Sequence, residues 1–425
     1  MAAIKPRLTI CVPSRNRQYY FQKTIEGLLR RAPEGVEFVF ADNSDDPSVM
    51  NDYMAELKND PRIVYLPSED RVLSMIDNWE RTLEAATGAW VSIIGDDDFI
   101  DPKLADLLDR ILAVNPEIEA FAWGVISYTW PGDNPNLTNV FVPYNSFTVK
   151  VPRDEPYKRM FGWVGARTVP TSGYSLYHSA YSRSLLDKIK AVTGKFFENP
   201  MVDYDIAMKA ITIAKHFAYC QRPISIMGSC PESNSYAVSR LSVAKQRSAQ
   251  FFGEVGRNTD EDIDQNDFPF TSDHGVTAAI AIVQQWYKSK YDGHYSGWEI
   301  EFTKTCARNT EGFADREEFD TVKANYDDAF SRWKGGKFLK FFKPEFRDRM
   351  QGLLVTGSSD DGIYLRSDIA GIKTPEQLYD IIESITPSLD MVEVAADGLK
   401  YPWEQTVQQV GRQSRTLVDA PARVA

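Results

Sequence analysis

The sequence predicts an α/β fold in which a largely parallel sheet has helices on both faces, followed by a mostly helical C-terminal region. Short apolar runs alternate with helical repeats through about the first 130 residues. Polar or acidic residues directly follow several of these runs, as at the ligand-binding edge of a parallel sheet. Helical patterns alone continue after residue 245. We therefore expect an α/β domain over residues 1–245 and a mainly α-helical region over residues 246–425.

The first strand is expected over residues 8–12, and four further apolar runs predict strands over residues 36–41, 63–66, 90–94 and 121–128. Between these runs, apolar residues three and four positions apart predict one helix each. The expected buried faces are Phe21, Ile25, Leu28 and Leu29; Val49, Tyr53 and Leu57; Ile76, Trp79, Leu83 and Ala86; and Leu104, Leu107, Leu108, Ile111 and Leu112.

Three consecutive carboxylates, Asp96, Asp97 and Asp98, follow the strand over residues 90–94. Like charges at the end of a buried strand repel one another, so they need a partner. Mg²⁺ or Mn²⁺ supplies one, because these hard cations prefer carboxylate oxygens and share their shell with substrate phosphates. The alternative is an acidic turn in which Asp101 caps the helix that starts at Pro102. That alternative leaves three further acids unexplained, so we favour a metal site.

Composition and charge argue against several classes of protein. The 425 residues carry a formal net charge of −12, which argues against sequence-independent binding to nucleic acid. Four scattered cysteines without a CxxC pair predict reduced thiols in a cytoplasmic protein, without a zinc site or a disulfide framework. The N-terminus shows no apolar signal core, and no run approaches the roughly 18 apolar residues of a spanning helix.

Four motifs in the same order resemble a family 2 glycosyltransferase of the GT-A fold, a Rossmann-like α/β arrangement. These motifs are residues 9–17 (TICVPSRNR), residues 39–44 (VFADNS), Asn78-Trp79 with residues 85–88 (AATG), and residues 95–98 (GDDD). The resemblance covers about the first 130 residues and continues more weakly to about residue 240. It implies a nucleotide-sugar donor, linked to UDP or GDP, a divalent metal held by a DxD-like motif, and inversion at the anomeric carbon.

The resemblance also implies roles for individual residues. Pro13, Arg15 and Asp42 would surround the nucleoside, with Asp42 accepting a hydrogen bond from the base. Asp96 would face the ribose or the metal, and Asp98 would ligate the metal. We add Asn16 and Asp97 to the donor-binding set, because they lie at the same strand ends.

Two arginines have open assignments. Arg71 can help to neutralise the donor phosphates, or it can form a salt bridge with Glu69 or Asp70. For Arg17 a solvated loop charge is an alternative, whereas Arg15 immediately follows a buried strand and is assigned to the site. A metal that bridges the two phosphates would stabilise the charge of the leaving group without a proton donor.

An inverting transfer needs a base on the sugar face opposite the diphosphate, so it should come from another part of the chain. Residues 199–205 (NPMVDYD) open a helix, and family members often carry Glu-Asp at this point. Here Val202 replaces the Glu. Asp203 aligns best with the base and Asp205 is the reserve, whereas the alternative is simple charge complementarity at a helix N-terminus.

The remaining segments carry weaker predictions. Residues 131–175 predict a long acceptor-side loop with a short hairpin, and residues 175–181 a strand in which His178 is a packed core residue. Residues 333–343 mix Lys with aromatic residues. This run can dock on an anionic membrane that carries a lipid-linked acceptor, on the inner membrane face. We favour the alternative, a helix that buries its aromatic face and keeps Lys in water.

Metal-dependent, inverting transfer of a sugar to a hydroxyl of a glycan or lipid-linked acceptor, in surface polysaccharide synthesis, is the function that the sequence favours. The first alternative is a nucleotidyltransferase, but those enzymes usually open with a Gly-rich phosphate loop, and residues 13–17 contain no glycine. The second is a non-catalytic nucleotide- or glycan-binding protein built on the same fold. The sequence does not specify the donor sugar, the acceptor or the oligomeric state.

Overall fold

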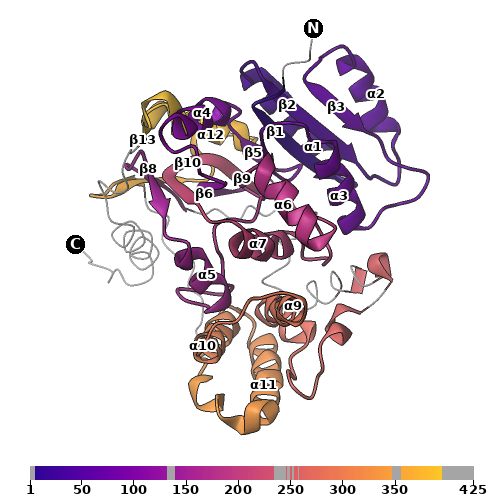
Figure 1. The fold of residues 1–425 in the computed structure, drawn as a ribbon. Coiled ribbons are helices and arrows are strands. Elements are labelled where there is room, and N and C mark those ends of the chain that lie inside the picture. Colours follow the sequence, from indigo (N-terminus) through magenta and orange to yellow (C-terminus); the bar gives the residue numbers. More distant parts are fainter. Residues whose placement is uncertain are drawn as a thin grey trace.

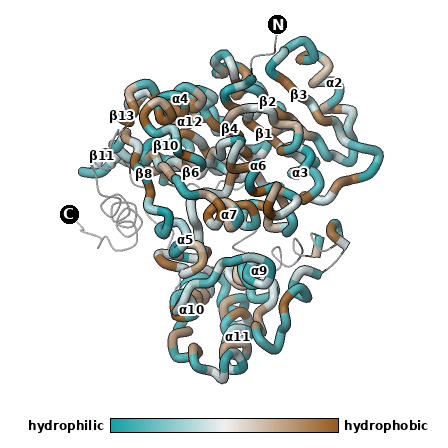
Figure 2. The backbone as a smooth tube through the Cα atoms, viewed as in Figure 1, coloured by the Kyte–Doolittle hydropathy of each residue, from teal (hydrophilic) through white to brown (hydrophobic). Residues whose placement is uncertain are grey.

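A computed structural model describes residues 5–131, 139–233, 246, 249–250, 253–256, 258–346 and 356–394 of the chain. A central mixed sheet dominates it, with strand order β13-β8-β10-β6-β9-β4-β1-β2-β3 and with β5 pairing β10 (Figure 1). Hydrophobic residues concentrate on the strands and on helix α7, as Figure 2 shows. The predicted α/β fold is confirmed.

The first half of the sheet is parallel, as the alternation of strands and helices predicts. β1 pairs β2 with Ser14 opposite Asp42, and it pairs β4 with Cys11 opposite Ile93. Every residue of β1, β2 and β4 is buried, which explains their continuous apolar runs. The elements of this half are β1 (Leu8–Ser14), α1 (Gln18–Arg31), β2 (Val36–Asp42), α2 (Ser48–Leu57), β3 (Ile63–Leu66), α3 (Met75–Ala85) and β4 (Trp90–Ile93).

The second half of the sheet is mixed, because β9, β5 and β8 all pair with their neighbours in antiparallel orientation. β9 lies antiparallel between β4 and β6, and β10 then runs parallel to β6. The structure thereby brings the segment that precedes β9 next to the end of β4. The elements here are β5 (Phe99–Ile100), α4 (Leu104–Val114), β6 (Ala120–Thr129), β9 (Ser179–Ser182), α6 (Arg183–Thr193), α7 (Val202–Ile213) and β10 (Phe217–Ser229).

Two local predictions need correction. The buried face of α2 is Met50 and Met54, whereas Val49 is exposed, so the predicted face is rotated by about one residue. No hairpin forms over residues 139–151, because β7 (Asn139–Pro143) pairs β12 while β8 (Phe147–Val151) pairs β10 and β13. The same region also contains helix α5 (Asp154–Phe161), where a loop was expected.

The helices of the C-terminal region, which lie beyond α5 and α7 in Figure 1, pack around their own core. They are α9 (Val276–Lys290), α10 (Trp298–Thr310) and α11 (Arg316–Arg332), with short 3-10 helices at Thr259–Asp262, Ser272–His274, Trp333–Gly336 and Leu339–Phe341. Trp333, Phe338 and Phe342 are buried in this core, and Lys334 pairs with Glu299 at 2.6 Å. The Lys-aromatic run therefore buries these aromatic rings, as the favoured interpretation expects, but it forms two short 3-10 turns and not the expected helix.

Residues 356–394 do not belong to the helical region, contrary to the predicted boundary at residue 245. They return to the α/β domain, where β12 (Gly362–Arg366) pairs β7, β13 (Glu393–Val394) pairs β8, and α12 (Pro375–Ile385) contacts β10 and β5. Arg31 on α1 pairs with Asp380 and Glu383 of α12. The apolar spacing over residues 378–385 indicates a helix at this point of the sequence but carries no information about where that helix docks. The remaining short elements are β11 (Gly357–Ser358) and 3-10 helices at Ile369–Gly371 and Leu389–Met391.

None of the helices formed by the described residues is long and apolar enough to cross a membrane.

Candidate active site

The ends of β1, β2 and β4 meet at one edge of the sheet, as the parallel topology predicts. Ser14 ends β1, Asp42 ends β2, and Asp96 follows β4. The Ser14 hydroxyl donates to Asp96 Oδ2 at 2.6 Å, and the backbone N–H of Asn43 donates to the Ser14 carbonyl at 3.0 Å. Residues from three separate motifs therefore share one site.

Arg17 is the main counter-charge of the acidic cluster. Asp96 and Asp97 are buried, and the Arg17 guanidinium lies 3.0 Å from Asp96 Oδ1 and 3.3 Å from Asp97 Oδ1. Asp97 Oδ2 also accepts from the backbone N–H of Cys230 at 3.0 Å. Burial raises the pKa of Asp96 to about 7 and raises that of Asp97 as well, although Arg17 opposes both shifts. The interpretation of Arg17 as a solvated loop charge is therefore wrong.

Asp98 has a different environment, because both of its oxygens accept hydrogen bonds from this chain. Oδ2 accepts from the backbone N–H of Gly95 (2.6 Å) and the hydroxyl of Tyr177 (2.5 Å), and it lies 3.0 Å from His178 Nε2. Oδ1 accepts from the backbone N–H of Gly228 at 2.6 Å. Burial alone would raise the pKa of Asp98, but the interaction with His178 and the other donors outweigh it and lower the pKa.

A glycine is required where β10 reaches the acidic cluster. A Cβ atom on Gly228 would lie 1.7 Å from the carbonyl oxygen of Asp97, which no side chain can tolerate. Only a residue without a Cβ atom lets this backbone approach closely enough for its N–H to reach Asp98. Asp98 thus ties three segments together: the end of β4, the segment before β9, and the end of β10.

His178 is a site residue that the sequence did not reveal. It is buried as predicted, but its Nε2 faces Asp98, while its Nδ1 lies 2.8 Å from the hydroxyl of Ser225. Trp123 Nε1 donates to the same hydroxyl at 2.8 Å. The backbone of His178 has φ 56°, which is uncommon for a residue with a side chain. Nothing in the local sequence signals this arrangement, because it depends on β9 lying beside β4.

The acidic residues, as the structure arranges them, do not fit a divalent cation. Asp98 receives four hydrogen bonds, which is about the full lone-pair capacity of a carboxylate. Asp96 and Asp97 share Arg17, and breaking a buried ion pair costs about 3–5 kcal/mol. Asp96 Oδ1 accepts no hydrogen bond and is held only by this ion pair. Within the described ranges, no group of three or more His, Cys, Asp or Glu side chains is arranged to hold a metal ion. The charge problem from which the sequence argument predicted a metal is met here by Arg17 at Asp96 and Asp97, and by hydrogen bonds at Asp98.

Asp42, the predicted contact for the base of the nucleotide, lies at the end of β2 and is buried. Its Oδ1 accepts from the hydroxyl of Ser44 at 2.6 Å, and its Oδ2 accepts from the hydroxyl of Ser68 at 3.0 Å. Its backbone carbonyl accepts from Arg81 at 2.6 Å. Asp42 therefore anchors two loops, and a ligand that hydrogen-bonds to Oδ2 would share it with Ser68.

The loop after β1 carries the other predicted nucleoside contacts. Pro13 is buried within β1, opposite Ala41 of β2. Asn16 joins its loop to the next one, because its side chain both donates to and accepts from Asp45 at 2.9 Å. Arg15 donates to Glu254 at 2.5 Å. Of these residues, Arg15 keeps a partly exposed charge beside the site.

Arg71 lies on an exposed loop that adjoins Asp42. Residues 68–71 line an open hollow of about 550 Å³. Ser68, at one end of this loop, donates to Asp42 as described above. Arg71 forms no ion pair with Glu69 or Asp70, and Glu69 lies 3.7 Å from Arg81 instead. The salt-bridge alternative for Arg71 is therefore not what the structure shows.

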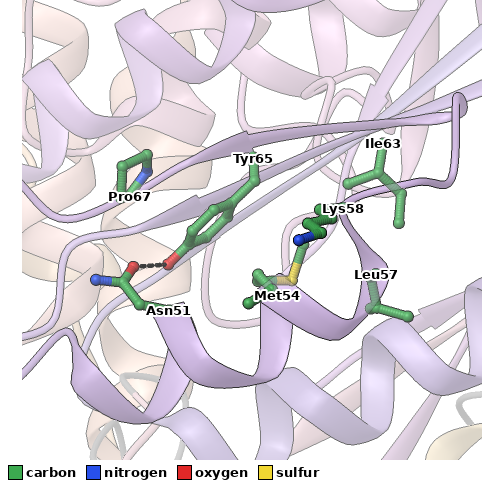
Figure 3. Close-up of a pocket in the computed structure, with 8 residues that line it drawn as sticks. Asn51, Met54, Leu57, Lys58, Ile63, Tyr65 and Pro67 are labelled. Carbon is green, nitrogen blue, oxygen red and sulfur yellow. Dashed lines mark hydrogen bonds between the residues drawn. The ribbon is translucent and has the colours of Figure 1, made fainter.

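A separate cavity of about 440 Å³ lies between α2 and β3, away from the acidic cluster. Figure 3 shows Tyr65 donating to Asn51 across it, at 2.9 Å. It contains none of the predicted site residues. Its lining residues are Asn51, Met54, Ala55, Leu57, Lys58, Ile63, Tyr65 and Pro67.

Asp203 lies in the first turn of α7, as predicted, and is half-buried. Burial raises the pKa of Asp203, and hydrogen bonds from the backbone N–H groups of Tyr204 and of Asp203 itself only partly offset this effect. The dipole of α7 favours the ionised carboxylate, but the effect of burial on the pKa is larger. A carboxylate with a raised pKa is a stronger base when it is ionised.

Asp205, the reserve base, has a structural role. Its Oδ2 accepts from the backbone N–H groups of Glu198 (2.5 Å) and Asn199 (3.1 Å), and its Oδ1 lies 3.2 Å from the fully buried Lys209. Burial raises its pKa to about 6, although Lys209 opposes this shift. Asp205 and Lys209 together hold the turn from which α7 begins, so they orient Asp203 rather than replace it.

Lys209→Met is expected to lower the free energy of unfolding by about 3 kcal/mol, because it leaves the buried Asp205 without its cation. The double variant Lys209→Met/Asp205→Asn should recover part of that loss, since neither charge then remains. Urea denaturation of the two variants and of Asp205→Asn measures this coupling. Equal stability of Lys209→Met and the native protein would contradict the structural role.

An aromatic series connects the acidic cluster to the start of α7. The ring of Tyr177, whose hydroxyl donates to Asp98, lies 6.1 Å from Trp79 on α3, and Trp79 lies 5.7 Å from Phe197. Phe197 belongs to the turn that Asp205 holds. Trp79, one of the motif residues, thus packs between the two predicted halves of the site.

No curated protein matches the chain. Among solved structures, S. aureus TarS 1-349 in complex with UDP-GlcNAc is similar, with a TM-score of 0.42 and 12% identity, over 79% of this chain and 89% of that chain. The mannosyltransferase PcManGT from Pyrobaculum calidifontis, in complex with GDP-Man and Mn2+, has a TM-score of 0.35 and 17% identity, over 80% and 86%. The sequence model of glycosyl transferase family 2 matches residues 9–189. Residues 9–189 of the chain are therefore similar to glycosyl transferase family 2.

Proposed function

We propose that this glycosyltransferase moves a sugar from a UDP- or GDP-linked donor to a hydroxyl of a glycan or lipid-linked acceptor, with inversion, in surface polysaccharide synthesis. The observation that carries the proposal is the convergence of Ser14, Asp42 and Asp96 at the carboxyl ends of three parallel strands, inside the family domain. Nucleotides bind at this edge of α/β sheets. The divalent cation that the sequence suggested is not part of the proposal, because Asp98 accepts four hydrogen bonds and Asp96 and Asp97 form ion pairs with Arg17.

In this proposal the nucleoside lies against Asp42 and the loop of residues 68–71, and Pro13 and Asn16 shape the floor between them. Arg15 and Arg71 are the exposed cations beside it. Asp203 takes the proton of the acceptor hydroxyl as that oxygen attacks the anomeric carbon. The reaction is placed in the cytoplasm, where the four cysteines, all of them buried free thiols, would stay reduced.

A panel of nucleotide sugars tests the function directly. Release of nucleoside diphosphate is measured with and without glycan acceptors, and the anomeric configuration of the product is read by NMR. One donor is expected to be hydrolysed slowly alone and faster with its acceptor, and the product should be inverted. If no nucleoside diphosphate binds and no donor is consumed, the proposal fails; a retained configuration contradicts single displacement.

Asp42→Asn is expected to weaken binding of the nucleoside diphosphate by about 10- to 100-fold, since a hydrogen bond to a charged acceptor contributes about 1.5–3 kcal/mol. Asparagine is preferable to alanine because it keeps an oxygen for Ser44. Calorimetric titration measures the effect, and Asp46→Asn, an exposed acid in the neighbouring turn, is the matched control. Unchanged affinity in Asp42→Asn would show that the nucleoside lies elsewhere.

A further inference from the structure

Arg17 contacts two acids of the cluster, Asp96 and Asp97, for which the sequence alone suggested a bridging cation. Arg17 contacts Asp96 at 3.0 Å and Asp97 at 3.3 Å, and its third contact is Cys230 Sγ at 3.9 Å. The acids hold the pKa of Arg17 above its usual range in spite of its burial. Arg17 is therefore a permanent charge at a fixed position.

The third acid of the cluster, Asp98, has no oxygen left over to ligate a metal ion. Asp98, one of the two residues that the sequence suggested as metal ligands, accepts four hydrogen bonds from donors on three segments. A metal ion at Asp98 would have to displace two backbone N–H groups, which cannot turn away without moving the end of β4 or β10. Asp96 and Asp97 are left as ligands. Arg17 donates to Asp97 Oδ1, and it forms an ion pair with Asp96 Oδ1, which accepts no hydrogen bond.

We infer that Arg17 holds the diphosphate of the donor and that a divalent cation is not required for donor binding. This inference rests on the proposed function, because it concerns the same nucleotide site. A guanidinium is planar and offers five N–H donors, and its three contacts with described residues leave two for phosphate oxygens. Its side chain is 21% exposed, so those donors can reach a ligand.

Two further features make the same place favourable for an anion. Arg17 immediately precedes α1, whose positive end carries no acidic residue in its first turn. Arg15, two residues earlier, is 29% exposed, and its partner Glu254 can be exchanged for a phosphate without breaking a fully buried pair. Two guanidinium groups and a helix N-terminus thus direct N–H donors to the same place, while Asp96, Asp97 and Glu254 balance the two guanidinium charges in the absence of a ligand.

Calorimetric titrations of the full chain with UDP and with GDP test the inference, each in EDTA and in Mn²⁺. The nucleotide that binds is expected to have the same dissociation constant within about threefold in both buffers. Titration of the nucleotide-free protein with Mn²⁺ alone should show no stoichiometric binding. Binding that appears only with Mn²⁺ overturns the inference but keeps the proposed function. No binding of any nucleotide in either buffer overturns the proposed function itself.

Variants separate the role of Arg17 from the stability of the cluster. Arg17→Gln is expected to weaken nucleotide binding in EDTA at least about 30-fold. Arg17→Lys keeps the positive charge but loses the planar, bidentate geometry of the guanidinium, so it should have an intermediate effect. Arg31→Gln is the matched control, because it removes a mostly buried guanidinium at the other end of α1, where Asp101, Asp380 and Glu383 surround it. Normal affinity in Arg17→Gln, with its fold verified by circular dichroism, contradicts the assignment.

Discussion

Asp203→Asn is expected to reduce the rate of sugar transfer by about 10²–10⁴, which is the usual contribution of a general base. The substitution keeps the shape of the side chain and removes its basicity. Donor binding should stay the same, because Asp203 lies on α7 and not at the ends of β1, β2 and β4. Product formation under saturating donor and acceptor measures the effect, and the melting temperature checks the fold.

The pH dependence of the rate gives this prediction a second readout. The base must be ionised, so the rate falls as the pH falls through its pKa. Because burial raises the pKa of Asp203, the acidic limb of the kcat profile is expected above the ordinary range of an aspartate. That limb should disappear in Asp203→Asn and stay in Asp187→Asn, an exposed control on α6. An active Asp203→Asn enzyme with an unchanged profile would remove Asp203 from the mechanism.

Asp98→Ala is expected to be the most destabilising single change in the site, with a loss of about 5 kcal/mol or failure to fold. Each buried donor left without an acceptor costs about 1–3 kcal/mol, and Asp98 accepts from Gly95, Tyr177, His178 and Gly228. Such a loss is a large part of the 5–15 kcal/mol that keeps a typical domain folded.

Urea denaturation of three variants separates this structural role from metal ligation. Asp98→Asn keeps an acceptor but adds a donor that faces other donors, so it should lose less stability than Asp98→Ala. Asp70→Asn, on the exposed loop beside Asp42, is the control and should be neutral. If Asp98→Ala is as stable as the native protein but no longer binds nucleotide in Mn²⁺, then Asp98 is a ligand and not the structural anchor described here.

Local sequence pattern was enough to predict some elements of the fold. Strands β1, β2 and β4 were predicted because a strand buried on both faces must be apolar along its whole length. The convergence of Ser14, Asp42 and Asp96 followed from one topological rule, that parallel strands end at the same edge. Helical spacing of apolar residues over residues 378–385 also indicates α12, which Thr374 caps in the structure. The docking of α12 on α1 could not be predicted, because helical periodicity indicates which face of a helix is buried but not which element covers it.

The sequence by itself determined the fold class, the edge of the sheet that forms the site and the family of the domain, because each depends on residues that are close in the chain or on a general rule of parallel sheets. The charge partners of the acids were decided only by the tertiary structure. Arg17 and His178 are 79 and 80 residues from Asp96 and Asp98, and they meet these acids because α1 starts at the same edge and β9 inserts beside β4. A run of three carboxylates reveals that a counter-charge must exist; whether it is a metal ion, an arginine or a histidine depends on which distant segment the fold places beside it.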